Sequence, residues 1–399
     1  MQGLTKETGL KQRLPVVKGT SEVRTALKTL GYRFAGGLLV LFGRSERAVS
    51  MLGKAVERDK RNLKLRLDLA QLLIRQGRTS DAIYQLQKTV LTIGPNPNLL
   101  YWLGEAYSLE GNQKATLQVL DRAGSMAPAN PEVWKAKARV LRQQGELTDA
   151  LACLERAAAA NPRDFGALND KGFVLMELGR TEDALICFEG CLRLRSRDAG
   201  ALANKGICLG KLGRYFEAMI SLKSALKFGP PTDVLYNNLA VALSNLSCYP
   251  EAVDAYQKAL ELAPEDWEVM SNLAAALGKC GRFEEALVYF DRVLQANSTD
   301  PLVLNNVGQC FEELNRMDRA LICYRQALSI EPGNRTVIFN LGACLIALGR
   351  LEESRELMFT HLTQDNGDRK AWGLLGEIYD KLSQYDLAVD CYNKALGLE

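Results

Sequence analysis

The chain has 399 residues, of which 47% are hydrophobic and 24% are charged. This composition supports a packed core and argues against an intrinsically disordered protein. The best candidate for a membrane span, residues 34–42, is nine residues long, which is too short to cross a bilayer. Ten cysteines without a C-x-x-C spacing and without a secretory signal indicate reduced thiols, so we expect a cytoplasmic protein with no membrane span.

Charge is distributed unevenly along the chain. Residues 1–140 carry 23 Lys and Arg against 11 Asp and Glu, whereas the remaining residues carry 27 against 36. Such polarity can steer a charged partner, although drift on a solvated surface gives the same pattern. At the start of the chain, residues 1–28 are predicted to form a basic arm that ends in a possible capping helix.

From residue 29 onward the sequence repeats every 34 residues without insertion or deletion. Position 8 of each repeat is small in all eleven repeats, position 20 is Ala in nine of them, and position 15 is Gly in eight. Small residues at positions 8 and 20 allow two helices to approach closely, and Gly at position 15 separates them. The repeats begin at residues 29, 63, 97, 131, 165, 199, 233, 267, 301, 335 and 369.

The residue before each repeat predicts where its first helix starts. From the second repeat onward this residue has a side-chain oxygen that can accept from a free N–H of the first helical turn, which stabilises a helix by about 1 kcal/mol. These residues are Asn62, Asn96, Asn130, Asp164, Asp198, Thr232, Asp266, Asp300, Asn334 and Asp368. Each repeat is therefore predicted to contain helix A at about positions 1–14, a turn, and helix B at about positions 18–31.

This pattern resembles the tetratricopeptide repeat family, which has the same period. The resemblance covers residues 29–399 and is close at residues 131–162. It implies an all-α fold, a right-handed superhelix of eleven helix-turn-helix repeats with helix A on the concave side. The departures are local. Ser247, Asn315 and Ser383 replace the turn Gly, and the tenth repeat has unusual residues at Ser354, Met358 and His361, so we expect that repeat to pack loosely.

Asparagines recur on helix A at the position where the core does not require them. The 3.6-residue period places positions 5 and 6 on the face away from helix B. A carboxamide offers one acceptor and two donors, which match the C=O and N–H of an extended peptide. The position-6 residues are Asn204, Asn238, Asn272, Asn306 and Asn340, preceded by Asp170 one repeat earlier, and Asn169, Asn237 and Asn305 form a second file at position 5.

These files predict a ladder that grips the backbone of an extended segment of another protein. They resemble the asparagine ladder of the tetratricopeptide superhelix in O-linked N-acetylglucosamine transferases, in which the amides hold a peptide. The residues between the rungs are mildly apolar, which suits small or apolar side chains. The alternative interpretation is that these asparagines serve helix packing or solubility.

A second candidate surface lies in the third and fourth repeats. Helix A of these repeats brings a basic cluster next to aromatic side chains, which together suit acidic or aromatic groups of a ligand. The alternative is a set of solvated charges with a partly buried Trp. The residues are Tyr101, Trp102, Lys135, Arg139 and Arg142.

The sequence contains no pattern typical of catalysis, so we expect a non-enzymatic scaffold or adaptor without a cofactor or a metal. The one histidine, His361, stands at a packing position, and the cysteines also fall at packing positions. One alternative is that the chain is the substrate-recruiting arm of a larger enzyme such as a glycosyltransferase. Another is nucleic-acid binding through the basic repeats, which we do not expect because the asparagine files lie in the acidic part of the chain.

Overall fold

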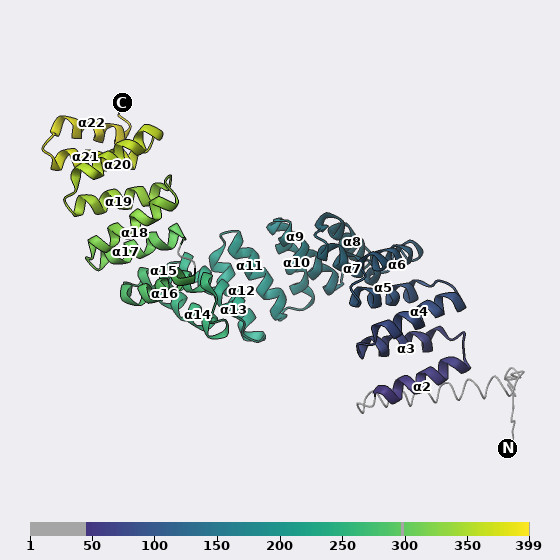
Figure 1. The fold of residues 1–399 in the computed structure, drawn as a ribbon. Coiled ribbons are helices and arrows are strands. Elements are labelled where there is room, and N and C mark those ends of the chain that lie inside the picture. Colours follow the sequence, from purple (N-terminus) through teal and green to yellow (C-terminus); the bar gives the residue numbers. More distant parts are fainter. Residues whose placement is uncertain (1–44, 297–298, 399) are drawn as a thin grey trace, which may run out of the picture. The chain divides into compact units, whose positions relative to one another are not determined.

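The computed structural model describes residues 45–296 and 299–398. All regular secondary structure within these residues is α-helical, which confirms the predicted fold class (Figure 1). The predicted basic arm at residues 1–28 and helix A of the first repeat lie outside the described residues. The first helix that is described, α2 (Ser45–Arg58), is helix B of that repeat. None of the described helices combines the length and the apolar character that a membrane span requires.

The A helices begin at the predicted residues in all ten repeats that the structure describes from residue 63 onward. This agreement follows from the capping residues, because each predicted oxygen accepts a hydrogen bond from a backbone N–H of the first turn, as Asn62 does from Leu65 and Asp368 does from Lys370 and Ala371. The A helices are α3 (Leu63–Arg75), α5 (Pro97–Leu109), α7 (Pro131–Gln143), α9 (Phe165–Glu177), α11 (Ala199–Lys211), α13 (Asp233–Asn245), α15 (Trp267–Lys279), α17 (Pro301–Glu313), α19 (Arg335–Ala347) and α21 (Arg369–Lys381).

The B helices begin one residue earlier than predicted, at position 17. Each follows a turn whose position-15 residue has a positive φ, including Ser247, Asn315 and Ser383 where Gly is absent. The B helices of repeats 2–11 are α4 (Thr79–Ile93), α6 (Gln113–Met126), α8 (Leu147–Ala160), α10 (Thr181–Leu194), α12 (Tyr215–Phe228), α14 (Tyr249–Leu262), α16 (Phe283–Ala296), α18 (Met317–Ile330), α20 (Leu351–Gln364) and α22 (Tyr385–Leu396).

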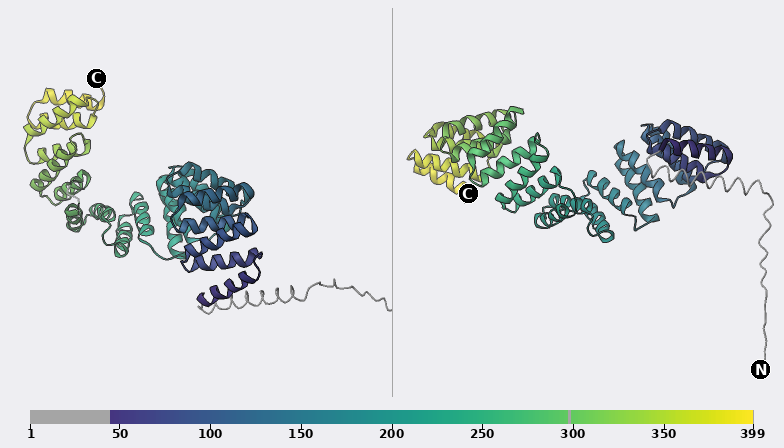
Figure 2. Two further views of the ribbon diagram at one scale, coloured as in Figure 1. Left: turned by 45° about the vertical axis from the view of Figure 1, so that its right-hand side comes forward. Right: turned by 90° about the horizontal axis from the view of Figure 1, so that it is seen from below.

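The chain divides into two compact halves, one that ends at Cys187 and one that starts at Phe188. Within each half, neighbouring helices lie side by side as stacked helical hairpins, which is visible in all three views (Figures 1 and 2). One hairpin cannot bury its apolar stripe alone, so each repeat completes its core against the next one.

Close contact between helices A and B depends on the small residue at position 8. In the ninth repeat, a Cβ added to Gly308 would lie 2.5 Å from the ring of Tyr324, which is fully buried. In the sixth repeat, a Cβ on Gly206 would lie 2.6 Å from Leu222. The partner in both cases is the large residue at position 24, so the 8–24 contact sets the spacing of the two helices.

The tenth repeat accommodates its unusual side chains within the core. Ser354 is fully buried and its hydroxyl donates to the carbonyl of Gly342 at 2.9 Å. Met358 is also fully buried, and His361 is 9% exposed. The loose packing expected for this repeat is therefore not seen at these three residues, which are buried and held in place, although a cavity opens beside Met358 and His361.

Candidate functional site

The five position-6 asparagines occupy equivalent places on five consecutive A helices of the C-terminal half. Each of these helices contacts the next A helix, and each of the five side chains is partly buried. We call this face of α11, α13, α15, α17 and α19 the asparagine wall. It carries Asn204, Asn238, Asn272, Asn306 and Asn340.

The side-chain amides of the asparagine wall differ in whether they form hydrogen bonds within the protein. Asn238 donates from Nδ2 to the carbonyl of Val234, 2.8 Å away on its own helix. Asn340 donates from Nδ2 to Oδ1 of Asn305 at 2.9 Å. Each of these two amides keeps a second N–H and its own oxygen.

The other three amides of the wall are open. The side chains of Asn204, Asn272 and Asn306 make no hydrogen bond with any other residue that the structure describes. Their donors and acceptors are therefore available to a ligand.

The second file, at position 5, does not form an open ladder. Asn305 is only 4% exposed, so the prediction that it faces the groove is wrong. Position 5 lies at the edge of the buried stripe, and in α17 the Asn305 side chain is covered where it accepts from Asn340 of α19. Asn237 has a buried Oδ1 without a hydrogen-bond partner among the described residues. In the N-terminal half, Asn169 is partly buried.

A cavity of about 610 Å³ opens on the asparagine wall between α15 and α17. Three of the four α15 residues that line it are small, which leaves space in front of two phenylalanines of α16, and the fourth is Lys279. Sequence reasoning missed this cavity, although the small residues at positions 8, 9 and 12 of one repeat were a detectable signal. Its lining includes Ala274, Ala275 and Gly278 of α15, Phe283 and Phe290 of α16, Asn306, Gln309 and Cys310 of α17, and Asn340 of α19.

A second cavity, of about 660 Å³, adjoins the first because Asn340 lines both. It opens between the beginnings of α19 and α21. Its lining includes the basic residues Arg335, Arg369 and Lys370, the apolar residues Ile338, Phe339, Met358 and Ala371, and His361.

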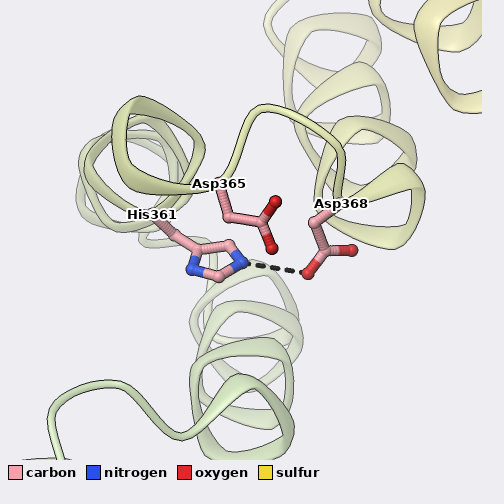
Figure 3. A group of neighbouring side chains, drawn as sticks. All are labelled: His361, Asp365 and Asp368. Carbon is pink, nitrogen blue, oxygen red and sulfur yellow. Dashed lines mark hydrogen bonds and ion pairs between the residues drawn. The ribbon is translucent and has the colours of Figure 1, made fainter.

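Two residues that line the second cavity, His361 and Asp368, belong to a compact group of polar side chains, which Figure 3 shows. His361 of α20, Asp365 of the following loop and Asp368 at the start of α21 point into the same space, and their ligand-type atoms lie within 4.8 Å of one another. Nε2 of His361 lies 2.9 Å from Oδ2 of Asp368. His361 is therefore a core residue with a polar partner, as its packing position suggested.

The carboxylates of this group are already engaged by the protein. Asp365 forms an ion pair with the guanidinium of Arg335 and accepts from the N–H of Gly367. Oδ1 of Asp368 caps α21, while its Oδ2 meets His361. Burial alone would raise the pKa of Asp368, but the hydrogen bonds from His361 and from the capped N–H groups outweigh burial and lower that pKa. The group supports the junction of α20 and α21, and a metal would have to displace Arg335.

The basic cluster predicted in the third and fourth repeats is paired internally. Lys135 lies 2.8 Å from both Glu132 and Asp164. Arg139 lies 3.3 Å from Glu105, and Arg142 lies 3.1 Å from Glu177. Apart from the Lys135–Glu132 pair within α7, the sequence could not show this pairing, because the long side chains reach carboxylates outside their own helix.

The cluster also surrounds one residue of the predicted ladder. Burial raises the pKa of Asp170, while Arg139, Lys135 and Arg142 act in the opposite direction. Beside the cluster, the rings of Tyr101 and Trp102 meet edge to face, with centroids 5.3 Å apart, and both residues are partly buried. The Lys135, Arg139 and Arg142 side chains are thus part of a local charge network that includes a carboxylate of the same face.

Comparison with family models identifies the family. The model described as "Cilia and flagella-associated protein 70 C-terminal domain" matches residues 43–277, which is more than half of the chain. The chain belongs to this family. A second model, "Cilia and flagella-associated protein 70 middle TPR-like domain", matches residues 270–399. The two models of the cilia and flagella-associated protein 70 family together cover all of the repeats that the structure describes. Their matches overlap at residues 270–277.

Solved structures of repeat proteins resemble this member of the cilia and flagella-associated protein 70 family in fold. A tetratricopeptide repeat protein from Parabacteroides merdae is 18% identical, with a TM-score of 0.46, over 62% of this chain and 98% of its own. The protein YrrB, titled "a TPR protein with an unusual peptide-binding site", is 24% identical, with a TM-score of 0.43, over 46% of this chain and 95% of its own.

A third structure, the APC/C hetero-tetramer Cut9-Hcn1, is 17% identical, with a TM-score of 0.47, over 75% of this chain and 59% of that chain. At these identities the likeness concerns the helical repeat fold alone. No curated protein matches the chain.

Proposed function

We propose that this chain is a non-enzymatic scaffold whose asparagine wall binds an extended segment of another protein. The observation that carries the proposal is the open amide of Asn306 beside the 610 Å³ cavity, which also presents the amide of Gln309. Asn204 and Asn272 repeat the open amide at the same helical position. The ladder of the O-linked N-acetylglucosamine transferases, to which these asparagines are similar, supports the same kind of ligand.

In the expected mechanism, the asparagine amides supply affinity for the peptide backbone, and the cavity supplies specificity for a side chain. Each open carboxamide can accept from a peptide N–H and donate to a peptide C=O, and a net gain of about 1 kcal/mol per bond is typical. The cavity between α15 and α17 has a size common among ligand sites and takes a side chain of the bound segment. Phe283 and Phe290 make its apolar floor, so we expect an apolar side chain there.

The family name directs the search for a partner to cilia and flagella. A scaffold of this family is proposed to act on proteins of the ciliary or flagellar apparatus, in place of the general cytoplasmic location expected from the sequence. The paired cluster of Tyr101, Trp102, Lys135, Arg139 and Arg142 is the weaker candidate surface, because a ligand carboxylate would have to displace an internal one.

The test uses peptides about 12 residues long, selected from a random display library on the full chain. The variant Asn204→Ala/Asn272→Ala/Asn306→Ala should weaken the selected peptides by roughly a hundredfold, since about three hydrogen bonds of about 1 kcal/mol are lost. As a control, Asn98→Ala/Asn393→Ala removes amides that do not belong to the asparagine wall. Equal affinity of the wall variant and the control variant, with circular dichroism showing intact helices, would exclude the wall as the binding surface.

A filled cavity gives an independent test. Leucine at Gly278 projects into the cavity, because a Cβ there meets only Sγ of Cys310, at 3.8 Å. Gly210→Leu is the matched control, since it has the same helical position in α11, no atom within 4 Å of the added Cβ, and no part in the cavity. Gly278→Leu should reduce peptide binding by more than Gly210→Leu, which adds the same side chain to the asparagine wall but outside the cavity.

A further inference from the structure

The rim of the second cavity carries basic residues in the first turns of two helices, where positive charge is unfavourable. Arg335 and Arg369 are the first residues of α19 and α21, and Lys370 is the second residue of α21. A helix N-terminus carries a partial positive charge, so cations in the first turn are unfavourable. The other described A helices begin without a cation at position 1, with Leu63, Pro97, Pro131, Phe165, Ala199, Asp233, Trp267 and Pro301.

Two of these three cations have no carboxylate partner among the described residues. Arg335 forms an ion pair with Asp365. The other carboxylate of the cavity, Asp368, meets His361 and caps α21. Arg369 and Lys370 are exposed and form no ion pair with any residue that the structure describes. The guanidinium of Arg369 lies beside Gly397 at the end of α22. The open side of the cavity therefore carries positive charge that no described carboxylate pairs with.

The floor of the same cavity is apolar. Ile338 is 6% exposed, Met358 is fully buried and Ala371 is 3% exposed. At the edge, the ring of Phe339 is 37% exposed. A ligand that fits both parts combines an apolar body with an anionic group.

We propose that this cavity binds an acidic residue of the partner's segment together with an adjacent apolar residue. The inference rests on the proposed function, because Asn340 lines both cavities and an extended segment on the asparagine wall passes from one to the other. The apolar side chain packs against Phe339 and Ile338. The carboxylate accepts charge-assisted hydrogen bonds from Arg369 and Lys370, which also removes the electrostatic cost at the start of α21.

The variant that tests the site reverses these two charges. Arg369→Glu/Lys370→Glu places carboxylates in the first turn of α21, where they interact favourably with the helix N-terminus. The variant is expected to be as stable as the wild type, so a loss of binding cannot be attributed to unfolding. The control is Arg61→Glu/Lys64→Glu, which makes the same change of charge at the start of α3, where Lys64 also holds position 2.

The probes are peptides about 12 residues long, selected from a random library on the wild-type chain, and matched peptides in which Asp or Glu is replaced by Asn or Gln. We expect an acidic residue next to an apolar one at a fixed place in the selected peptides. Neutralising it should weaken binding to the wild type about tenfold or more by fluorescence anisotropy. Arg369→Glu/Lys370→Glu should weaken the acidic peptide to a similar extent and leave the neutral peptide unaffected, and the control variant should bind both peptides as the wild type does.

Two outcomes would contradict the inference in different ways. If peptides bind and depend on Asn204, Asn272 and Asn306, but show no acidic preference and no sensitivity to the reversed charges, the acidic site is wrong and the proposed function stands. If the wild type selects no peptide, the proposed function fails and the acidic site fails with it.

Discussion

The side-chain amide of Asn340 donates to the side-chain oxygen of Asn305, 2.9 Å away on the preceding A helix. Asn305 is almost completely buried, so this bond joins α17 to α19 inside the protein. The same hydrogen bond holds the Asn340 side chain in place, and Asn340 lines both the first and the second cavity.

Removing the donor should show how much this hydrogen bond contributes to the free energy of unfolding. Asn340→Ala leaves the buried oxygen of Asn305 unpaired, and we expect a loss of about 1–3 kcal/mol in the free energy of unfolding, measured by urea denaturation of the full chain. Asn272→Ala removes an amide without a partner and replaces a poor helix former, so its stability should be unchanged or higher by up to about 0.6 kcal/mol. Equal stability of the two variants would show that the Asn305–Asn340 bond contributes nothing.

The contact between Gly308 and Tyr324 predicts a steric effect. Gly308→Ala should destabilise the protein by about 1–3 kcal/mol, because the new methyl group would overlap a buried ring that cannot move freely. The hydroxyl of Tyr324 donates to Glu312 at 2.8 Å, which fixes the ring in place. Gly210→Ala meets no atom within 4 Å and should stabilise its helix by about 0.5–1 kcal/mol. Thermal denaturation of the two variants should shift in opposite directions.

The turns that lack Gly predict a gain in stability. Ser247 has a φ of 60° and Asn315 a φ of 57°, in the left-handed region that costs an ordinary side chain roughly 1–2 kcal/mol. Ser247→Gly should therefore stabilise the protein by about 1 kcal/mol after the entropy of the more flexible unfolded chain is subtracted. Asn315→Gly should have a smaller effect, because Asn tolerates this conformation. A larger gain at Asn315 than at Ser247 would contradict this explanation.

The lowered pKa of Asp368 predicts how stability depends on pH. Its carboxylate is favoured in the folded protein, so its contribution is fully present above the ordinary Asp value of about 3.9 and is lost as the pH falls below it. Asp368→Asn keeps a side-chain oxygen for the helix cap but cannot titrate. The difference in urea midpoint between wild type and variant should shrink as the pH is lowered from 6 to about 3. A difference that stays constant over this range would be inconsistent with the interpretation.

Local rules sufficed to predict the framework of the molecule from its sequence. The start of each A helix follows from one capping residue, as Asn62 and Asp368 illustrate, and the 8–24 contact needs only residues of a single repeat, such as Gly308 and Tyr324. Even Ser247 adopts the backbone conformation of the glycine that it replaces, because the fold on both sides of the turn requires it.

The features that escaped prediction depend on groups from several helices. Asn305 stands at the border between the buried and open faces, where a single neighbour, Asn340, decides its exposure. The first cavity appears only when small residues of α15 meet the phenylalanines of α16, and the pairing of Lys135 needs Asp164 of the next repeat. Periodicity assigns a face to each residue, but it does not reveal what lies across from that residue.

The uniform spacing of the A helices determines how such a chain can change its length. Removing a whole stretch of 34 residues would join two ends whose caps, turns and 8–24 contacts are already equivalent. Removing one residue from a helix would rotate everything beyond it by about 100° around the helix axis and turn its apolar stripe toward water. We therefore expect duplications and losses of entire hairpins to be tolerated far more readily than single-residue deletions within one.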